Sequence, residues 1–301
     1  MILVLKQVLV LFSFAAIGCY LAASKKIKTE HTPILSSLLV NVFLPFNLFK
    51  TFSANFTKEY VWANYQLLIS SAAVTICLMV IMHFAAKLFD KRKYEQGICE
   101  YSLTIPNYGY MGYPMAEAIG GTSGLLNAMV FGFPISFYTY TVGYCNLSKM
   151  KITFKKLFNP IMLSMLLGAI VGFLGIKIPS VLSDIFGKAS ACMGPVSMLL
   201  AGMVVSEFNF RELLSMKKIY IITALRLVII PVIIGYALLP FNKTAMETAV
   251  ILFAMPCGLN TIIFPRLVGE DCRIGAGLAL LSNILACFTI PLVLGFFGIG
   301  G

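Results

Sequence analysis

Charged residues are scarce in this sequence, which excludes a water-soluble globular protein. Asp, Glu, Lys and Arg make up 12% of the 301 residues, roughly half the share found in soluble domains. Hydrophobic residues make up 59%, and the mean hydropathy is +0.91. At about 20 apolar residues per transmembrane helix, ten spans would use roughly 200 residues and leave only short loops. The composition therefore predicts a polytopic α-helical membrane protein.

Metal-binding and catalytic signatures are also lacking. The chain has two histidines, no H-E-x-x-H segment and no C-x-x-C segment, and its eight cysteines are scattered through mostly apolar stretches. We interpret these cysteines as small buried apolar residues rather than as a disulfide or metal framework. The sequence predicts no metal site, no cofactor and no enzymatic activity.

Acidic residues are few: 12 Asp and Glu stand against 23 Lys and Arg, giving a net charge of +11. In a soluble protein such an excess would suggest nucleic acid as a partner. Here the basic residues lie between apolar stretches, so membrane topology is the simpler explanation and no nucleic-acid partner is predicted. The predicted spans are 2–23, 33–54, 60–89, 97–119, 124–146, 157–176, 186–207, 218–240, 246–265 and 274–298.

The basic residues are unevenly divided between the two sets of loops. Fifteen of them follow odd-numbered spans, whereas four lie in or beside the loops after even-numbered spans. Because cytoplasmic loops are enriched in Lys and Arg, we predict that the odd-numbered loops face the cytoplasm. Both termini then lie outside the cell membrane, which requires an even number of spans, such as ten.

The two halves of the chain resemble each other. A shift of 150 residues places the fourth span on the ninth and Ile105-Pro106-Asn107 on Met255-Pro256-Cys257. Pro33 opens the second span, and Pro195 is predicted to interrupt the seventh. Two halves of five spans each are inverted relative to one another, a plan that recurs in secondary transporters. We therefore predict two inverted five-helix repeats, residues 1–150 and residues 151–301.

Proline and glycine predict a break in the fourth span and another in the ninth. The fourth contains Pro106-Asn107-Tyr108-Gly109, and the ninth contains Pro256-Cys257-Gly258 followed by Asn260. Proline removes a backbone donor and clashes with the preceding turn, and a broken helix in lipid is tolerated where it is buried in protein or lines a cavity. Both prolines lie about 15 Å from the end of their span, near the middle of the bilayer.

Each break presents the N-terminus of a half-helix, where free N–H groups and a partial positive charge favour anions such as carboxylates. Asn107 and Asn260 lie beside the breaks and can hydrogen-bond a polar substrate. Ordinary membrane-helix kinks are the alternative explanation for one such proline. Two breaks at corresponding places in inverted halves favour a binding site.

These segments resemble the auxin efflux carrier family. The stretch from Pro106 to Pro114 is similar to the N-x-x-x-x-G-x-P stretch of that family's fourth span. Further similarities are Asn41 through Pro45 to its second span, Asn159-Pro160 with Gly168 and Gly172 to its sixth, and Pro256 through Asn260 to its ninth.

The resemblance implies a ten-helix inverted repeat in which broken spans four and nine cross at the membrane midplane, as in bile-acid sodium symporters and related antiporters. The family includes plant auxin carriers and bacterial carriers described as malonate or malate permeases. By position, it implies Asn107 beside the first crossover, Pro256 at the second, and Asn41 and Asn260 as lining residues.

Two departures from the family pattern narrow this expectation. Residues 147–158 suffice for the loop between spans five and six, which is long in plant members, so a bacterial-type member is indicated and auxin is not the expected substrate. No pair of acidic residues lies near mid-membrane, which weakens the case for a sodium or proton site copied from the antiporters.

Arg226 is the strongly basic residue placed deepest in a span. A charge about 12 Å along a transmembrane helix is costly and faces a partner or a cavity. It is either an anion counter-ion or a structural residue that snorkels or pairs. The predicted substrate-binding residues are Asn41, Pro106, Asn107, Tyr108, Gly109, Arg226, Pro256, Cys257, Gly258 and Asn260.

Three functions are compatible with these features. We favour a secondary active carrier of a small organic anion, with a coupling proton or sodium ion and a homodimeric assembly as further possibilities. The alternative is an ion-coupled symporter or antiporter of the related fold that moves a different solute. A receptor or scaffold is disfavoured because it has no use for helices broken at the midplane.

The charge asymmetry makes the orientation testable. Single cysteines placed in residues 147–158 of a cysteine-free variant should resist an impermeant thiol reagent added to intact cells, because the loop is expected on the cytoplasmic side. Mass-shift labelling before and after permeabilisation measures this. Ready labelling of intact cells would reverse the predicted orientation.

Overall fold

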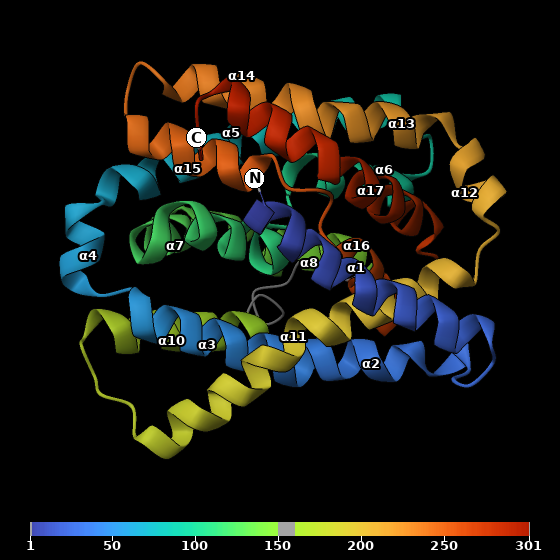
Figure 1. Cartoon of the computed structure of the whole chain (residues 1–301), viewed down its shortest axis with the longest axis horizontal. Coiled ribbons are helices and arrows are strands. Elements are labelled where there is room, and N and C mark those ends of the chain that lie inside the picture. Colours follow the sequence, from blue (N-terminus) through green and yellow to red (C-terminus); the bar gives the residue numbers. More distant parts are fainter. Residues whose placement is uncertain (1, 150–159, 301) are drawn as a thin grey trace.

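The computed structural model describes residues 2–149 and 160–300, and the regular structure in these ranges is helical apart from one isolated β-bridge. Its helices form two bundles with a shared middle layer (Figure 1). Most of residues 147–158, and the boundary between residues 1–150 and 151–301, lie outside the described ranges.

Six helical segments of the described chain are long and apolar enough to cross a membrane, fewer than the ten spans predicted from the sequence. The difference has physical causes. The breaks leave short pieces of the fourth and ninth predicted spans, and the second half of the fourth runs on with the fifth as Tyr108–Leu147. The apolar helices Ser13–Ala23 and Pro160–Phe173, in the first and sixth predicted spans, are also too short to be counted. The six are Thr29–Asn55, Tyr65–Leu88, Tyr108–Leu147, Ser180–Ser206, Lys217–Leu238 and Arg273–Phe296.

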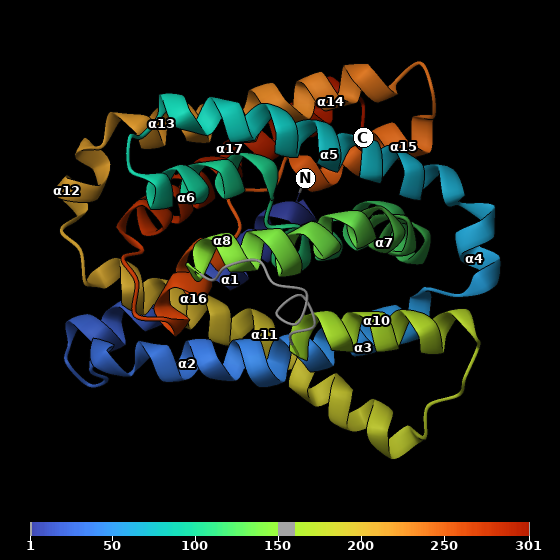
Figure 2. The ribbon, with the colours of Figure 1, turned by 180° about the vertical axis from the view of Figure 1, so that it is seen from behind.

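Most of the first bundle is the lower layer of Figure 1, which α1 reaches from the middle of the molecule, and Figure 2 shows the same grouping from behind. In it α1 packs against α11, and α3 packs against both α10 and α11. A π-helical turn joins α2 to α3, and Pro33 lies in the first turn of α2, as predicted. The members are α1 (Ile2–Ala23), α2 (Thr32–Leu38), α3 (Leu44–Asn55), α10 (Pro160–Phe173) and α11 (Ser180–Ser206).

Glycines bring the backbones of the first bundle into contact. A Cβ at Gly202 of α11 would overlap the carbonyl oxygen of Ala15 in α1, and a Cβ at Gly172 of α10 would crowd carbonyl oxygens of α3. In a bilayer, helix association depends on such close packing because lipid chains are as apolar as the side chains. Pro195, in contrast, lies inside a continuous α11, so the predicted interruption of that span is wrong.

The second bundle takes helices from both halves of the chain. Its outer helices are α5, α6, α13, α14, α15 and α17, while α7, α8 and α16 lie in the middle layer (Figure 2). Short helices α4 (Lys58–Ala63) and α12 (Phe210–Ser215) join the two bundles. The bounds are α5 (Tyr65–Ala85), α6 (Lys93–Thr104), α7 (Tyr113–Tyr138), α8 (Tyr144–Leu147), α13 (Lys217–Ala224), α14 (Ile230–Leu238), α15 (Lys243–Phe253), α16 (Asn260–Leu267) and α17 (Arg273–Phe296).

The long α7 is a helical hairpin. Gly121 has φ 60° and ψ −151°, a conformation outside the helical region that glycine adopts without strain. The Tyr108 hydroxyl lies 3.0 Å from that of Ser136, 28 residues further along the chain. In a straight helix these residues would be about 42 Å apart. The glycine-rich segment Gly120 to Gly124 therefore holds the turn between the two arms of α7.

The connections gather at two opposite ends of the molecule. The α1–α2, α5–α6, α11–α13 and α16–α17 connections lie at one end, and the α3–α5, α10–α11 and α14–α15 connections lie at the other (Figure 1). We call the former the basic end, because it carries most of the lysine and arginine residues. Several are held in ion pairs: Lys218 with Asp90 and with Glu95, Arg266 with Glu207, Lys149 with Glu270 and Arg273 with Glu212.

The close packing of α1 on α11 predicts that Gly202→Ala destabilises the protein. The added methyl group must push the two backbones apart, and overpacking costs about 1–3 kcal/mol. Gly194→Ala is the matched control, since it lies in the same helix with no atom within 4 Å of the added Cβ. Thermal unfolding in detergent measures both. Equal melting temperatures for the two variants would contradict the proposed role of this contact.

Candidate functional site: two paired helix breaks

The first break separates α6 from α7. α6 ends at Thr104, and Ile105 is extended, with φ −108° and ψ 115°. Its conformation follows from Pro106, because the proline ring disfavours the helical region for the preceding residue. The chain resumes as a π-helical turn at Tyr108–Gly112, which continues into α7. The predicted break in the fourth span is confirmed.

The second break separates α15 from α16. α15 ends at Phe253, and α16 begins at Asn260, so six residues around Pro256 and Gly258 are not α-helical. A Cβ at Gly258 would lie 3.5 Å from the carbonyl oxygen of Pro106. This is an ordinary van der Waals distance, so Gly258 lies directly against the first break. The predicted break in the ninth span is also confirmed.

The two breaks satisfy each other's backbone groups. Pro106 and Cys257 form an antiparallel β-bridge, and the Asn107 N–H donates a 2.8 Å hydrogen bond to the Pro256 carbonyl oxygen. The Cys257 N–H donates to the Ser282 hydroxyl of α17 at 3.1 Å. Backbone groups freed from a helix in a low-dielectric interior need such partners. This pairing brings residues 150 positions apart together.

Two asparagines mark the beginnings of the resumed helices. Asn107 is 2% exposed, and neither its amide oxygen nor its amide nitrogen has a hydrogen-bond partner among the described residues. The Asn260 amide nitrogen donates to the Tyr101 hydroxyl at 2.8 Å, while its oxygen is unpartnered within the same ranges. Buried polar atoms without partners are costly, and each here could bond a bound polar molecule.

A cavity of about 20 Å³ lies against both breaks. Asn47 and Leu48 of α3 and Met193 of α11 close it from the first bundle, and Tyr140 lines it from the second. Among the predicted site residues, six line it: Pro106, Asn107, Tyr108, Gly109, Gly258 and Asn260. This volume corresponds to about one water molecule, so this conformation is closed around the site.

A larger vestibule of about 430 Å³ adjoins the small cavity. It shares Asn47, Gly109, Tyr110, Tyr113 and Met193 with the cavity and extends past Lys50 and Glu117. Asn55 at the end of α3 and Leu125 after the α7 turn also line it, so it leads toward the end of the molecule opposite the basic end.

Arg226 lies behind the breaks and does not line the cavity. It is completely buried, its Nη1 lies 3.5 Å from the Leu103 carbonyl oxygen, and its guanidinium lies 5.4 Å from the centre of the Phe253 ring. Leu103 and Phe253 are in the last turns of α6 and α15, where helix dipoles carry partial negative charge. Arg226 is therefore placed to stabilise the C-terminus of α6 through the Leu103 carbonyl group, and it packs on the Phe253 ring at the end of α15.

Asn41 is not brought to the site. Its side chain is exposed and its amide nitrogen donates to the Ser37 carbonyl oxygen at 3.0 Å within the same helical segment. Pro256 and Cys257 do not line the cavity; they pair with Asn107 and Pro106 of the first break, and Cys257 is fully buried. The four buried cysteines are Cys99, Cys145, Cys257 and Cys272; Cys77 and Cys192 are exposed, so the prediction of buried cysteines holds only in part.

Sequence reasoning missed Tyr101, Asn47, Met193 and Ser282. Tyr101 precedes Pro106 by just over one helical turn, a spacing that could have indicated it. The other three come from distant helices, and no local pattern identifies them. Within residues 2–149 and 160–300, no three His, Cys, Asp or Glu side chains gather where they could hold a metal ion.

Comparison with known proteins gives consistent matches along the chain. The family described as "Membrane transport protein" matches residues 3–153 and 145–294. "Uncharacterized transporter YfdV" of Escherichia coli K12 is 23% identical over 297 residues, covering 92% of each chain. "Uncharacterized transporter MJ1031" of Methanocaldococcus jannaschii is 22% identical over 298 residues, covering 95% of this chain and 96% of its own. These matches indicate transport rather than catalysis.

The difference between the two asparagines predicts different effects on stability. Asn260→Ala loses a buried hydrogen bond to Tyr101, whereas Asn107→Ala loses none, and both leave the same void. Asn260→Ala should therefore cost about 0.5–1.5 kcal/mol more than Asn107→Ala. Thermal unfolding of the purified variants measures the difference, with Tyr101→Phe as a second way to remove the bond. Equal destabilisation by both asparagine variants would contradict this assignment.

Proposed function

Because this chain belongs to the membrane transport protein family, we propose that it is a secondary active transporter that moves a small organic anion carrying a carboxylate. The observation that supports this proposal is the pairing of the two helix breaks beside one buried cavity. The long apolar helices make the chain a multi-pass membrane protein, as a transporter of that family requires.

The chemistry of the cavity favours a negatively charged oxygen. The half-helices that begin at Tyr108 and Asn260 start at the cavity, and helix N-termini carry partial positive charge. The unpartnered amide nitrogen of Asn107 adds a hydrogen-bond donor. The compensating helix C-termini are turned toward Arg226, behind the cavity. This polarity suits a carboxylate better than a cation.

Alternating access would require the two bundles to move relative to each other. Asn47, Leu48 and Met193 belong to the first bundle, whereas both breaks belong to the second, so the cavity lies at the contact between the bundles. At about 20 Å³ it cannot hold a carboxylic acid in the closed conformation. Separation of the bundles toward the vestibule would open the site to one side of the membrane.

The proposal includes ten membrane crossings in two inverted halves. The five crossings of the first half are α1, the α2–α3 segment, α5, the broken α6–α7 pair and the second arm of the α7 hairpin, and the second half supplies five counterparts. The basic end would face the cytoplasm and both termini the outside of the cell membrane. A sodium or proton gradient and a homodimeric assembly belong to the same proposal.

Uptake into proteoliposomes tests the function directly. The purified full-length protein should take up labelled members of a panel of mono- and dicarboxylates, with imposed proton and sodium gradients identifying the coupling ion. Asn107→Ala and Asn260→Ala should lower apparent affinity several-fold, as expected for loss of a buried hydrogen bond. Selective uptake of a neutral or cationic solute would favour the ion-coupled carrier of a different solute instead.

Charge selection by Arg226 is a further expectation of this proposal. Arg226→Gln should lower the affinity for the dicarboxylate malonate roughly three- to tenfold more than the affinity for the monocarboxylate propionate. The reason is that a fixed charge acts strongly in a low-dielectric interior. Arg226→Lys should be intermediate, since it keeps the charge without the planar fork. Competition for uptake measures both affinities. An equal loss for malonate and propionate would make Arg226 purely structural.

A further inference from the structure

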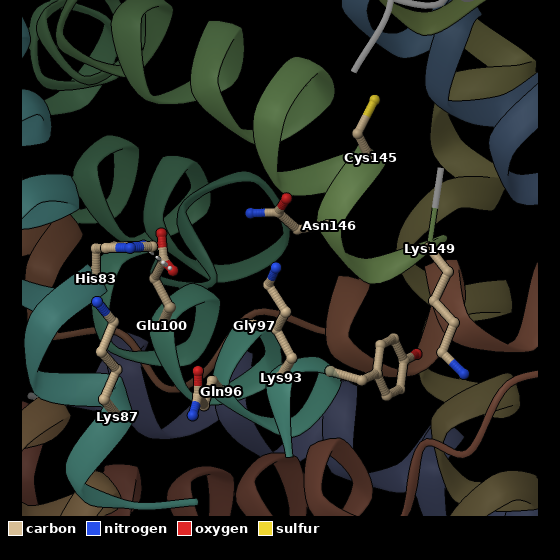
Figure 3. Close-up of a pocket in the computed structure, with 10 residues that line it drawn as sticks. His83, Lys87, Lys93, Gln96, Gly97, Glu100, Cys145, Asn146 and Lys149 are labelled. Carbon is tan, nitrogen blue, oxygen red and sulfur yellow. Dashed lines mark hydrogen bonds and ion pairs between the residues drawn. The ribbon is translucent and has the colours of Figure 1, made fainter. Parts of the chain in front are cut away.

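A second large cavity lies at the basic end, about 610 Å³ in volume and separate from the vestibule. It is formed by the ends of α5, α6 and α8. Figure 3 shows His83 and Glu100 adjacent to each other, with Lys87 near them and the Lys93 ammonium group pointing toward Asn146. Its lining residues are His83, Lys87, Lys93, Tyr94, Gln96, Gly97, Glu100, Cys145, Asn146 and Lys149.

Glu100 is the acidic side chain in this otherwise basic lining. One of its carboxylate oxygens lies 3.0 Å from His83 Nδ1, and the other accepts a 3.2 Å hydrogen bond from the Tyr138 hydroxyl. The Glu100 side chain is 9% exposed, whereas that of His83 is 56% exposed. The histidine therefore lies between a nearly buried carboxyl group and the cavity at the basic end.

Two routes lead from this carboxyl group to the paired breaks, one along α6 and one through Tyr138. Glu100 lies on α6 six residues before Pro106, about 9 Å along the helix axis. Tyr138 follows Ser136 by two residues, and the Ser136 hydroxyl lies 3.0 Å from that of Tyr108 at the cavity. A change at Glu100 can therefore reach the cavity through α6 and through the second arm of α7.

The geometry points to Glu100 as the binding site of a coupling proton, with His83 exchanging that proton with solvent. In the loading step, His83 passes a proton from water to a Glu100 carboxylate oxygen, giving a neutral carboxylic acid. In the release step, the same proton returns through His83 to water and leaves the carboxylate. No other bond forms or breaks. This inference rests on the proposed anion carrier.

Loading the proton removes the negative charge from a cavity in which the remaining charges are basic. An anion on its way to the breaks then meets no opposing carboxylate there. By linkage, a proton on Glu100 raises the affinity for the anion by the same factor as the bound anion raises the affinity of Glu100 for the proton. At a separation of about 10 Å in protein, one unit charge changes an affinity on the order of tenfold.

Other titratable or charged groups surround Glu100 on each neighbouring element. Lys149 is already paired with Glu270, and Lys218 with Asp90 and Glu95, whereas the Lys87 ammonium lies over the Phe84 ring. The groups to be considered in a titration are His83 on α5, Lys87 just after α5, Lys93, Tyr94 and Glu95 on α6, Tyr138 on α7, Lys149 after α8, Lys218 on α13 and Arg226 before α14.

Proteoliposomes containing a trapped pH-sensitive dye and supplied with radiolabelled malonate test the inference. In the wild type, a pH gradient should drive malonate accumulation, and the dye should report protons entering with it. Glu100→Gln, which mimics a permanently protonated carboxyl group, should reduce gradient-driven accumulation at least tenfold and abolish the proton signal. His83→Gln should slow proton entry several-fold. Glu59→Gln, on the exposed face of α4, is the matched control and should behave as wild type.

Infrared difference spectroscopy of the purified protein gives a readout that does not depend on transport. When the pH is lowered, the difference spectra of the wild type and of Glu59→Gln should contain a protonated-carboxyl band that the spectrum of Glu100→Gln lacks.

The outcomes separate the two proposals. Retention of both the band and gradient-driven accumulation in Glu100→Gln overturns the proton site. If the wild type exchanges malonate at a rate independent of the pH gradient and Glu100→Gln keeps the band, the proton site is overturned. The anion-carrier proposal then still stands. A wild type that moves no carboxylate, with a band lost in Glu100→Gln, overturns the anion carrier and supports the proton site.

Discussion

The structure depends on how two interrupted helices satisfy their backbone hydrogen bonds inside an apolar bundle. A proline in a transmembrane helix leaves carbonyl and N–H groups without partners, and lipid offers none. Here the break at Pro106 and the break at Pro256 supply partners to each other, through the bridge to Cys257 and the hydrogen bond from the Asn107 N–H. Ser282 of α17 completes the pairing. Neither break would be tolerated so easily alone, which explains why both occur.

Pairing the breaks also sorts the helix dipoles. The C-terminal turns of α6 and α15 approach the buried guanidinium of Arg226, and the N-terminal turns of the resumed helices begin at Asn107 and Asn260. Negative and positive ends are therefore separated to two sides of the same pair of segments. An arginine buried without an acidic partner in the described chain would otherwise be difficult to explain, because an uncompensated buried charge is costly.

The cavity lies where two bundles of different character meet. The first bundle is held by glycine contacts such as Gly202 on Ala15 and contributes the Asn47 amide together with the apolar side chains of Leu48 and Met193. The second bundle contributes both breaks, their asparagines and the charged groups that face the basic end. A site formed between two bodies, rather than inside one, can change its access without unfolding either.

The sequence by itself determined the class of protein and the two breaks. Scarce charge required a membrane, and Pro106, Pro256 and the glycines near them required interruptions, because these effects are local and follow from composition or from a single ring. The turn at Gly121 was predictable for the same reason. Pro195 shows the limit of that reasoning, since α11 continues through it.

Only the tertiary structure decided which side chains meet. It turned Asn41 outward, paired Asn260 with Tyr101, placed Arg226 behind the cavity and joined His83 to Glu100. The number of long apolar helices also depended on the tertiary structure, because an apolar stretch of full length can contain two short helices on either side of a break. The physical reason is common to all of these: contacts between helices far apart in sequence depend on how their faces pack, and the period of apolar residues along one helix does not record its neighbours.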